Sequence, residues 1–333
     1  MKFGLTLPNR GVLFGAITPE QMLEMGEIAD GSGRFDDVWV GDSLLGKPRM
    51  ESMTLMAALA GRTRRVRIGP ACMASLPLRD PLLLAYQWAS LDLLAAGRTV
   101  LVACTGIVPQ AGGALEAAHY GLDNKERAGR LVEWITILKR LWTEDDVDFE
   151  GRYYRLRGIT MEPKPFAKPR PPIWIANNAL GPRQVVERTH RRVARHADGW
   201  MTSLSDPDEV EWRLRDVREK ASALGRNPDE LETCLYHNIN VQPDRDAALA
   251  ESKRFLDTYY MMDMPIERVA SWTAAGSAAE CVEHLRVYER MGIQTVALRC
   301  TSWDQMGHLR RVMDEVLPHF ASPEVPGQHR IRL

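Results

Sequence analysis

Few side chains with acid–base chemistry stand where the apolar segments of this chain end. These ends carry one acid, Asp42, one histidine, His237, and one arginine, Arg299. So few acids and bases are typical of an enzyme whose bound cofactor carries the chemistry while the protein binds and shields it. We therefore expect Asp42 to act as a hydrogen-bond acceptor or base, Arg299 to anchor an anionic group, and His237 to be a further candidate catalytic residue. The alternatives are that Asp42 only caps the following turn and that Arg299 pairs with an acid outside the site.

The other side chains at these ends are small, apolar or amide groups. Those predicted to contact a cofactor are Asn9, Ala71, Cys72, Thr105, Gly106, Asn177 and Asn178. The last two open a turn at 177–181 between an apolar run, 173–175, and a helix that Pro182 suits as its first residue. Free N–H groups and the positive end of the helix dipole favour a phosphate there. Gly181 and Arg183 are therefore further candidate phosphate ligands; an ordinary turn with a surface arginine is the alternative.

Apolar strands and amphipathic helices alternate along the whole chain. The predicted strands are 3–7, 38–40, 66–68, 99–103, 173–175, 199–201, 233–241 and 295–299. Eight strands in this order predict an α/β fold, a (β/α)8 TIM barrel with insertions, over residues 1–320, followed by a C-terminal tail, 321–333. An open doubly wound sheet is the alternative, but no G-x-G-x-x-G motif follows the first strand and no P-loop occurs. A hairpin is expected at 147–161, outside the barrel.

Composition excludes several classes of function. The 333 residues have a net charge of -1, which gives no reason to expect a nucleic-acid or membrane partner. Five scattered cysteines without a C-x-x-C spacing, and no apolar leader, predict a cytoplasmic protein. The eight histidines lie mostly on helices or at the termini, so no metal site is expected. His190 and His196, among several arginines, are predicted to form the solvated end of a helix.

Seven short segments together carry a family resemblance. They are FDDVWVGD (35–42), RVRIG (65–69), LPLRDP (76–81), FEGRYY (149–154), PKP (163–165), PPIWI (171–175) and ADGW (197–200). In this order and spacing, the chain resembles the bacterial luciferase-like family of flavin-dependent oxidoreductases. The resemblance covers nearly the whole chain and implies a barrel that binds FMN or a deazaflavin coenzyme at its mouth. It also implies a cis peptide between Ala71 and Cys72 behind the cofactor ring, and a homodimer formed through helices at 51–62 and 82–95.

Three departures from the family pattern bear on the chemistry. Ala176 and Asn177 stand where the family often has paired glycines for the phosphate. Ser43 follows Asp42 where several deazaflavin dehydrogenases have a histidine, and Ile107 stands where the sugar-phosphate dehydrogenases have a glutamate. The last two differences argue against that dehydrogenase chemistry.

Three functions are compatible with the sequence. The first is a monooxygenase that receives reduced FMN from a flavin reductase and uses oxygen on a small organic substrate. The second is a hydride-transfer oxidoreductase that uses reduced deazaflavin, and the third is a flavin-binding barrel without turnover. In each case a lid is expected from 107–121 and 261–276, because both loops are long. Its substrate wall would comprise Tyr259, Tyr260, Met261, Met262, Met264 and Trp272.

Overall fold

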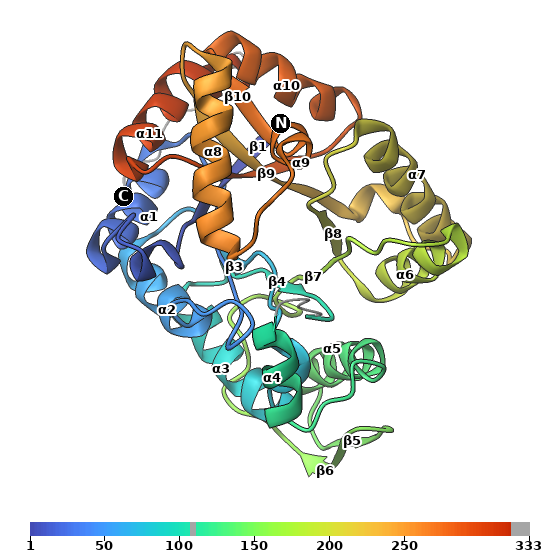
Figure 1. Ribbon diagram of the computed structural model, residues 1–333. Coiled ribbons are helices and arrows are strands. Elements are labelled where there is room, and N and C mark those ends of the chain that lie inside the picture. The colour runs from blue at the N-terminus through green and yellow to red at the C-terminus, as the bar shows by residue number, and fades with distance from the viewer. Residues whose placement is uncertain (107–110, 321–333) are drawn as a thin grey trace, which may run out of the picture.

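Eight parallel strands form a nearly closed barrel in the computed structural model, which describes residues 1–106 and 111–320. The strands are β1 (Lys2–Leu7), β2 (Asp37–Val40), β3 (Arg67–Pro70), β4 (Leu101–Ala103), β7 (Ile173–Ala176), β8 (Gly199–Thr202), β9 (Glu232–Val241) and β11 (Thr295–Cys300). They pair in the order β3-β2-β1-β11-β9-β8-β7-β4. Isolated bridges from Ile68 to Thr99 and from Met73 to Ala103 bring β3 beside β4 and complete the ring. The predicted TIM barrel is confirmed, with all eight strands near their expected positions (Figure 1).

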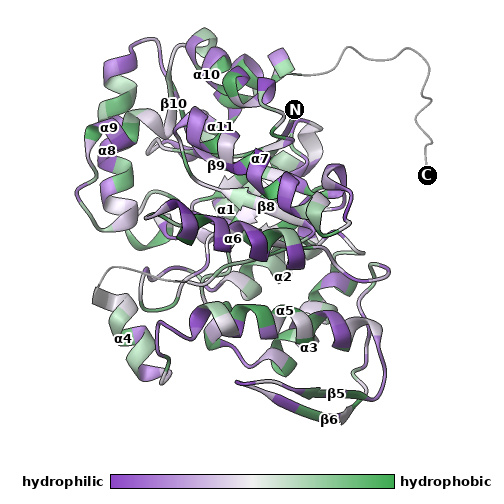
Figure 2. Ribbon diagram, turned by 90° about the vertical axis from the view of Figure 1, so that its right-hand side faces the viewer, coloured by the Kyte–Doolittle hydropathy of each residue, from purple (hydrophilic) through white to green (hydrophobic). Residues whose placement is uncertain are grey.

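Helices between the strands cover the outside of the barrel. They are α1 (Pro19–Ser32), α2 (Ser52–Arg62), α3 (Pro81–Leu94), α4 (Ala111–His119), α5 (Arg127–Thr143), α6 (Arg183–His196), α7 (Pro207–Ala223), α8 (Arg245–Tyr260), α9 (Ile266–Ser271), α10 (Ala278–Arg290) and α11 (Gln305–Arg311). A π-helical turn, Val312–Val316, and a 3-10 turn, Leu317–Phe320, continue α11. Figure 2 shows hydrophilic residues prominent on α6 and more apolar residues on α3 and α5. Among the described residues, no helix is both long and apolar enough to cross a bilayer.

Local caps determine where several helices begin. Thr18 and Gln21 form a reciprocal capping box at α1, and Ser277 and Glu280 form a second at α10. Asp80 caps α3, and its carboxylate accepts a hydrogen bond from Leu83 N at 2.8 Å. Each cap satisfies N–H groups that the first turn of a helix leaves free, so these boundaries could be predicted from neighbouring residues alone.

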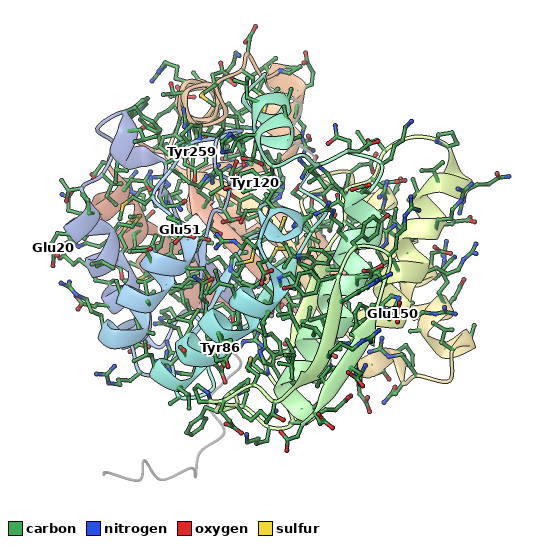
Figure 3. The ribbon with its side chains drawn as sticks, turned by 90° about the horizontal axis from the view of Figure 1, so that it is seen from below. Glu20, Glu51, Tyr86, Tyr120, Glu150 and Tyr259 are labelled. Carbon is green, nitrogen blue, oxygen red and sulfur yellow. The ribbon has the colours of Figure 1, made fainter. Side chains whose placement is uncertain are left out.

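Two insertions depart from a plain barrel. The predicted hairpin is confirmed: β5 (Val147–Glu150) and β6 (Arg155–Ile159) pair antiparallel outside the ring. Figure 3 places Glu150 of this hairpin across the molecule from Glu20 on α1. The segment 261–276 was expected to be a long loop, but it contains α9 and a further strand, β10 (Thr273–Gly276). β10 pairs with the second half of the ten-residue β9 and so extends the barrel wall at its mouth.

The barrel interior is filled largely by two tryptophans. The Trp39 and Trp174 rings lie with their centroids 5.5 Å apart, and both side chains are buried. Gly69 lets them fit, because a Cβ at this position would lie 2.3 Å from the Val100 carbonyl oxygen and 2.7 Å from the Trp39 ring. These packed rings fill the lower barrel, and the carboxyl ends of the strands, where TIM barrels carry their active sites, lie above them.

Asn9, predicted to bind the cofactor, instead ties loops together beneath the mouth. Its Nδ2 donates to the Gly41 carbonyl at 2.8 Å and to the Met50 carbonyl at 3.1 Å, and its Oδ1 accepts from Gly41 N at 3.1 Å. The side chain is fully buried, and it does not line the cavity described below. Its amide is hydrogen-bonded to backbone groups of the loop after β2. The prediction that Asn9 contacts the cofactor is therefore corrected.

Replacing Asn9 should therefore destabilise the fold. Asn9→Ala leaves buried backbone groups of Gly41 and Met50 without partners, and we expect a loss of about 2–4 kcal/mol in the free energy of unfolding. Urea denaturation of the unliganded protein measures this free energy of unfolding. Gln184→Ala, which removes an exposed amide, is the control and should change stability by less than about 0.5 kcal/mol. Equal stabilities of the two variants would contradict this account of Asn9.

Candidate active site

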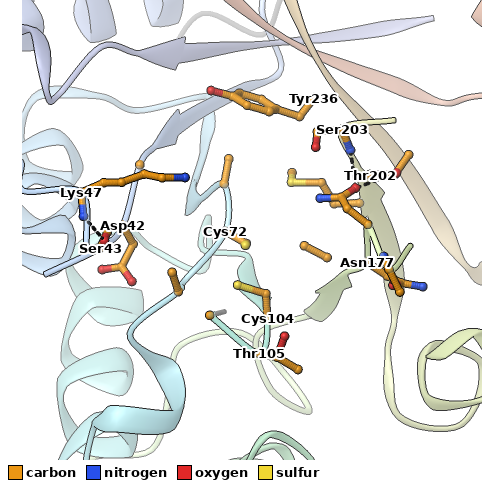
Figure 4. Close-up of a pocket in the computed structure, with 18 of the residues that line it drawn as sticks. Asp42, Ser43, Lys47, Cys72, Cys104, Thr105, Asn177, Thr202, Ser203 and Tyr236 are labelled. Atoms are coloured by element: carbon orange, nitrogen blue, oxygen red, sulfur yellow. Dashed lines mark hydrogen bonds between the residues drawn. The ribbon is translucent and has the colours of Figure 1, made fainter. Parts of the chain in front are cut away.

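A cavity of about 740 Å³ opens at the carboxyl ends of the barrel strands. Residues from the ends of β2, β3, β4, β7, β8 and β9 line it, together with the segment after α8 (Figure 4). Its volume is typical of a site for a cofactor or a small organic ligand. The position is where TIM barrels carry their active sites, so this cavity is the candidate active site.

The structure brings most of the predicted site residues to this cavity. Those that line it are Asp42, Ala71, Cys72, Thr105, Gly106, Asn177 and Asn178, together with Tyr260, Met262, Met264 and Trp272 of the predicted substrate wall. Tyr259 and Met261 of that wall do not line it. Tyr259 is buried behind Tyr260, and Met261 is about half exposed in a left-handed turn at the end of α8.

Small residues form the wall at the exits of β3 and β4. The peptide between Ala71 and Cys72 is cis, as predicted. Cys104 lies opposite, and its hydrogen bond with Cys72, together with burial, raises the pKa of its thiol, so it stays protonated. Gly106 has a φ of 67°, and a Cβ there would lie 1.8 Å from the Ala74 carbonyl oxygen. Only glycine fits this approach, and the result is a wall with room for a flat ring.

Asp42 lies at the cavity edge, but its carboxylate is already engaged. It accepts hydrogen bonds from Ser52 Oγ and from Ser75 N, both at 2.7 Å, and Arg79 Nη2 lies 3.5 Å away. Its side chain is only 2% exposed. These partners join the loops after β2 and β3 to the start of α2. The structure therefore gives Asp42 the turn-fixing contacts that the sequence left as the alternative to a base.

The turn after β7 is held by its two asparagines. Asn177 Nδ2 donates to Thr189 Oγ1 at 2.7 Å, and Asn178 Oδ1 accepts from Ser203 N at 2.8 Å. Pro182 is the N-cap of α6 rather than its first helical residue, and no side chain caps this helix. Gly181 and Arg183 do not line the cavity.

Arg183 turns away from the turn it was predicted to serve. Its guanidinium stacks 4.1 Å from the Trp212 ring centroid and pairs with Glu187 at 3.5 Å. Both partners lie on the outer helices, and the stacking surface explains why the sequence-based placement at the cavity is incorrect. Of the residues of α6, Thr189 and Arg192 line the cavity, so a phosphate on this side would depend on Arg192 rather than on Arg183.

Arg299 lies behind the cavity wall rather than in it. Its side chain is fully buried; Nη2 donates to Asn238 Oδ1 at 2.7 Å and Nη1 to the Tyr260 hydroxyl at 3.0 Å. The guanidinium carbon lies 4.5 Å from the Tyr259 ring centroid and 5.3 Å from that of Tyr236. Direct contact between Arg299 and an anionic ligand is therefore blocked by its own aromatic neighbours.

Two histidines lie in environments that differ from the prediction. His237 points out of the barrel, and its Nε2 is 2.8 Å from His284 Nε2 of α10, where burial keeps its pKa well below the ordinary value. His190 is fully buried rather than solvated; its Nδ1 is 2.5 Å from Asp216 Oδ2, and burial lowers its pKa. Burial, with nearby cations, also lowers the pKa of His196 to about 4.

Four cationic side chains that the sequence analysis did not single out line the cavity. They are Lys47, Arg49, Arg192 and Arg268. Lys47 and Arg49 follow β2, and Figure 4 shows the Lys47 ammonium directed into the cavity. Burial lowers the pKa of Lys47 and of Arg192. No acid of the described residues forms an ion pair with any of the four. The only sequence signal was that Lys47 and Arg49 follow a predicted strand end.

The two expected lid segments differ in how they relate to the cavity. Met262, Met264 and Trp272 of the second segment line it, so that segment is at the predicted face of the barrel. Within 107–121, residues 107–110 lie outside the described residues. Helix α4 packs on the loop after β2, where Glu116 accepts a hydrogen bond from Gly46 N at 3.2 Å. Whether either segment closes over a ligand stays a prediction.

The donor groups at the cavity suit a flat, anionic cofactor better than a metal. The small wall at Ala71 and Cys72, the polar turn at Asn177 and Asn178 and the excess of cations fit a ring that carries a phosphate. Among the described residues, no three histidine, cysteine or acidic side chains gather as metal ligands would.

Comparison with proteins of known structure and sequence agrees with this architecture. F420-dependent glucose-6-phosphate dehydrogenases from Nakamurella multipartita and Microbacterium testaceum are 28% and 29% identical to this chain. Each alignment covers 91% of this chain, and 93% or 94% of the relative. F420 is the deazaflavin coenzyme.

Two solved structures share the fold. A monooxygenase from Streptomyces bottropensis has a TM-score of 0.78 at 24% identity, over 96% of this chain and 100% of its own. An F420-dependent secondary alcohol dehydrogenase, solved with an F420-acetone adduct, has a TM-score of 0.81 at 18% identity, over 96% and 99%. The family model described as luciferase-like monooxygenase matches residues 1–295. This match confirms the resemblance carried by the short segments: the chain is an oxidoreductase and belongs to the luciferase-like monooxygenase family.

Proposed function

We propose that this protein transfers a hydride between a deazaflavin coenzyme and a small organic molecule, with an alcohol and its carbonyl product as the reacting pair. Relatives that align over nine-tenths of this chain are named as F420-dependent dehydrogenases. They favour the deazaflavin alternative over the FMN monooxygenase that we placed first from sequence. When bound, the coenzyme supplies the hydride acceptor or donor, and the protein binds and orients it.

The observation that carries this proposal is the charge of the cavity lining. Among the described lining residues, four are cations, and the one carboxylate, Asp42, is engaged by Ser52 and Ser75. Cations held in a partly dry site attract anionic ligands strongly. A deazaflavin coenzyme with a phosphate and a carboxylate tail matches this charge better than FMN, which carries the phosphate alone.

The substrate we propose is not glucose 6-phosphate. Ile107, which lies outside the described residues, stands where the sugar-phosphate dehydrogenases have a glutamate, and Ser43 stands where several deazaflavin dehydrogenases have a histidine. Ser43 is buried, and its Oγ accepts from Lys47 N at 2.9 Å, so it fixes a turn. The apolar side of the cavity, with Met262, Met264 and Trp272, suits a substrate with a hydrocarbon part.

Cofactor titration tests this function. We expect the purified protein to quench the fluorescence of the oxidised deazaflavin coenzyme with a Kd well below that for FMN. A panel of isopropanol, cyclohexanol, lactate and glucose 6-phosphate should then reduce the bound coenzyme with at least one of the first three. Tighter binding of FMN, with oxygen consumption in the presence of a flavin reductase, would contradict this proposal and favour the FMN monooxygenase.

Arg192 should contribute to cofactor binding. Its partly buried guanidinium lines the cavity on the same side as Asn177 and Thr189. Removing it therefore deletes a charged hydrogen-bond donor for a phosphate. Arg192→Met should weaken deazaflavin binding about 10-fold or more, since such a bond is worth roughly 1.5–3 kcal/mol. The matched control is Arg191→Met, which removes an exposed charge next to it. Equal affinities of the two variants in a fluorescence titration would remove Arg192 from the site.

The homodimer expected from the family resemblance remains a proposal, and an apolar hollow on the outer barrel supports it. Met53 and Ala57 of α2 and Tyr86, Leu91 and Leu94 of α3 line this hollow. Leu94 is 64% exposed. Contiguous apolar surface of this kind on a soluble protein commonly marks an interface. The two helices are those expected to pair.

A charge in this hollow should separate the subunits. Leu94→Glu places an ion against the partner's apolar surface, so light scattering at micromolar concentration should report a monomer where the wild type is a dimer. Leu224→Glu alters another exposed leucine, at the end of α7, and should leave the dimer intact. A monomeric wild type would end the proposal.

A further inference from the structure

The buried positive charge of Arg299, behind the cavity wall, must be compensated by the groups around it. Arg299 is fully buried on β11, and no acid of the described residues forms an ion pair with it. Its polar partners are the Asn238 amide oxygen and the Tyr260 hydroxyl, and aromatic rings surround the rest. A buried charge of this kind is costly unless a neighbour compensates it. Among these neighbours, the phenol of Tyr260 is the group that could become an anion at the cavity surface.

Tyr260 is placed to carry that negative charge. Its oxygen accepts from Arg299 Nη1 at 3.0 Å, it forms a hydrogen bond with Tyr236, and the Lys47 ammonium lies 4.8 Å from its ring centroid. Burial raises the pKa of Tyr260, but Arg299 and Lys47 more than offset it, so the net pKa is below the ordinary value. The pKa values of Tyr236 and Tyr288 move in the opposite direction, mainly because of burial.

The charged and titratable groups around Tyr260 come from several elements. Arg299 faces it from β11, Tyr236 from β9, Lys47 from the loop after β2, and Arg268 from α9. Tyr259, its neighbour on α8, packs edge-on against its ring. Three of these groups, Arg299, Lys47 and Arg268, are cations that favour a negative charge on Tyr260, and none of the groups named is an acid.

The remaining candidate proton acceptors at the cavity are occupied or protonated. Asp42 is held by Ser52 and Ser75, and the Cys104 thiol is kept neutral. His237 faces α10 outside the barrel. Tyr260 lines the cavity directly and belongs to the same cluster as Lys47, whose ammonium is also within electrostatic reach of Cys72.

We propose that Tyr260 is the proton-transfer residue of this site: its phenolate, hydrogen-bonded by Arg299 and with the Lys47 ammonium over its ring, accepts the hydroxyl proton of an alcohol substrate. This inference rests on the proposed function, because the oxidised deazaflavin coenzyme is the electron acceptor. The C–H bond of the alcohol breaks and its electron pair leaves as hydride to the coenzyme. The O–H electron pair becomes the second bond of the carbonyl, and the proton goes to the Tyr260 oxygen and then to solvent. In the reverse direction the neutral phenol returns the proton.

The protonation state can be measured without cofactor or substrate. In a pH titration of the unliganded protein, phenolate absorbance in the near ultraviolet should rise by the equivalent of one tyrosine below the pH at which exposed tyrosines ionise. Tyr260→Phe should remove this early step. Tyr120→Phe, which deletes an exposed phenol just after α4, should leave it. Lys47→Met should move the step to higher pH, because a cation that favours the phenolate is gone.

Turnover then tests the catalytic role. With the alcohol from the panel that reduces the coenzyme, Tyr260→Phe should lower kcat about 100-fold or more while coenzyme affinity is retained. In the wild type, kcat for alcohol oxidation should rise with pH through the same early step, and in Lys47→Met that rise should shift with the absorbance.

The outcomes separate the two proposals. If no alcohol reduces the coenzyme, the proposed function fails and the catalytic role of Tyr260 fails with it, whereas the absorbance titration still reports the phenolate. An early phenolate step that Tyr260→Phe does not remove would overturn the assignment of the charge. Full turnover by Tyr260→Phe, with an unchanged pH profile, would overturn the catalytic role while leaving the proposed function intact.

Discussion

The site depends on the burial of one guanidinium. Arg299 leaves β11 inside the wall of the barrel, where losing its hydration must be offset by hydrogen bonds and by the faces of aromatic rings. Asn238 on β9 and Tyr260 at the end of α8 supply the hydrogen bonds, and the Trp272 ring lies 5.6 Å away before β10. The same contacts hold α8 and the following segment against the mouth. The substrate side of the cavity is therefore positioned by a charge that does not itself line it.

Asp42 performs the corresponding task on the opposite wall. Its carboxylate joins Ser52 at the start of α2, Ser75 after β3, and Arg79 beyond it. An acid that follows a barrel strand is usually considered for catalysis, but here both of its oxygens accept hydrogen bonds that serve the fold. With this carboxylate engaged, the cavity keeps an excess of positive charge. That excess, rather than an acid or a histidine, determines which ligands and which proton acceptor the site can use.

How much the sequence could predict follows from the range of each interaction. The eight strands and the capped helices depend on neighbours a few residues apart, and they were found. The cavity wall at Ala71, Cys72, Thr105 and Gly106 was found with them. The side of the barrel wall to which each side chain points was harder to predict, because successive residues of a strand point to opposite sides. Tyr236 and Asn238 point inward, whereas His237 contacts His284 outside the barrel. The sequence does not show which of Arg191 and Arg192 faces the cavity, since both belong to one basic run. That choice depends on how α6 packs against the barrel.

The cations at the cavity divide into two groups with separate tasks. Figure 4 places Lys47 and Asn177 on opposite sides of the space. Arg192 lines the cavity with Asn177 and Thr189, where we expect a cofactor phosphate, whereas Lys47 and Arg299 act on Tyr260. An anion bound next to Lys47 would cancel part of its field and restore the proton to the phenol. Because the phosphate is expected at the other end, cofactor binding can use its cation without removing the charge that keeps Tyr260 ready to accept a proton.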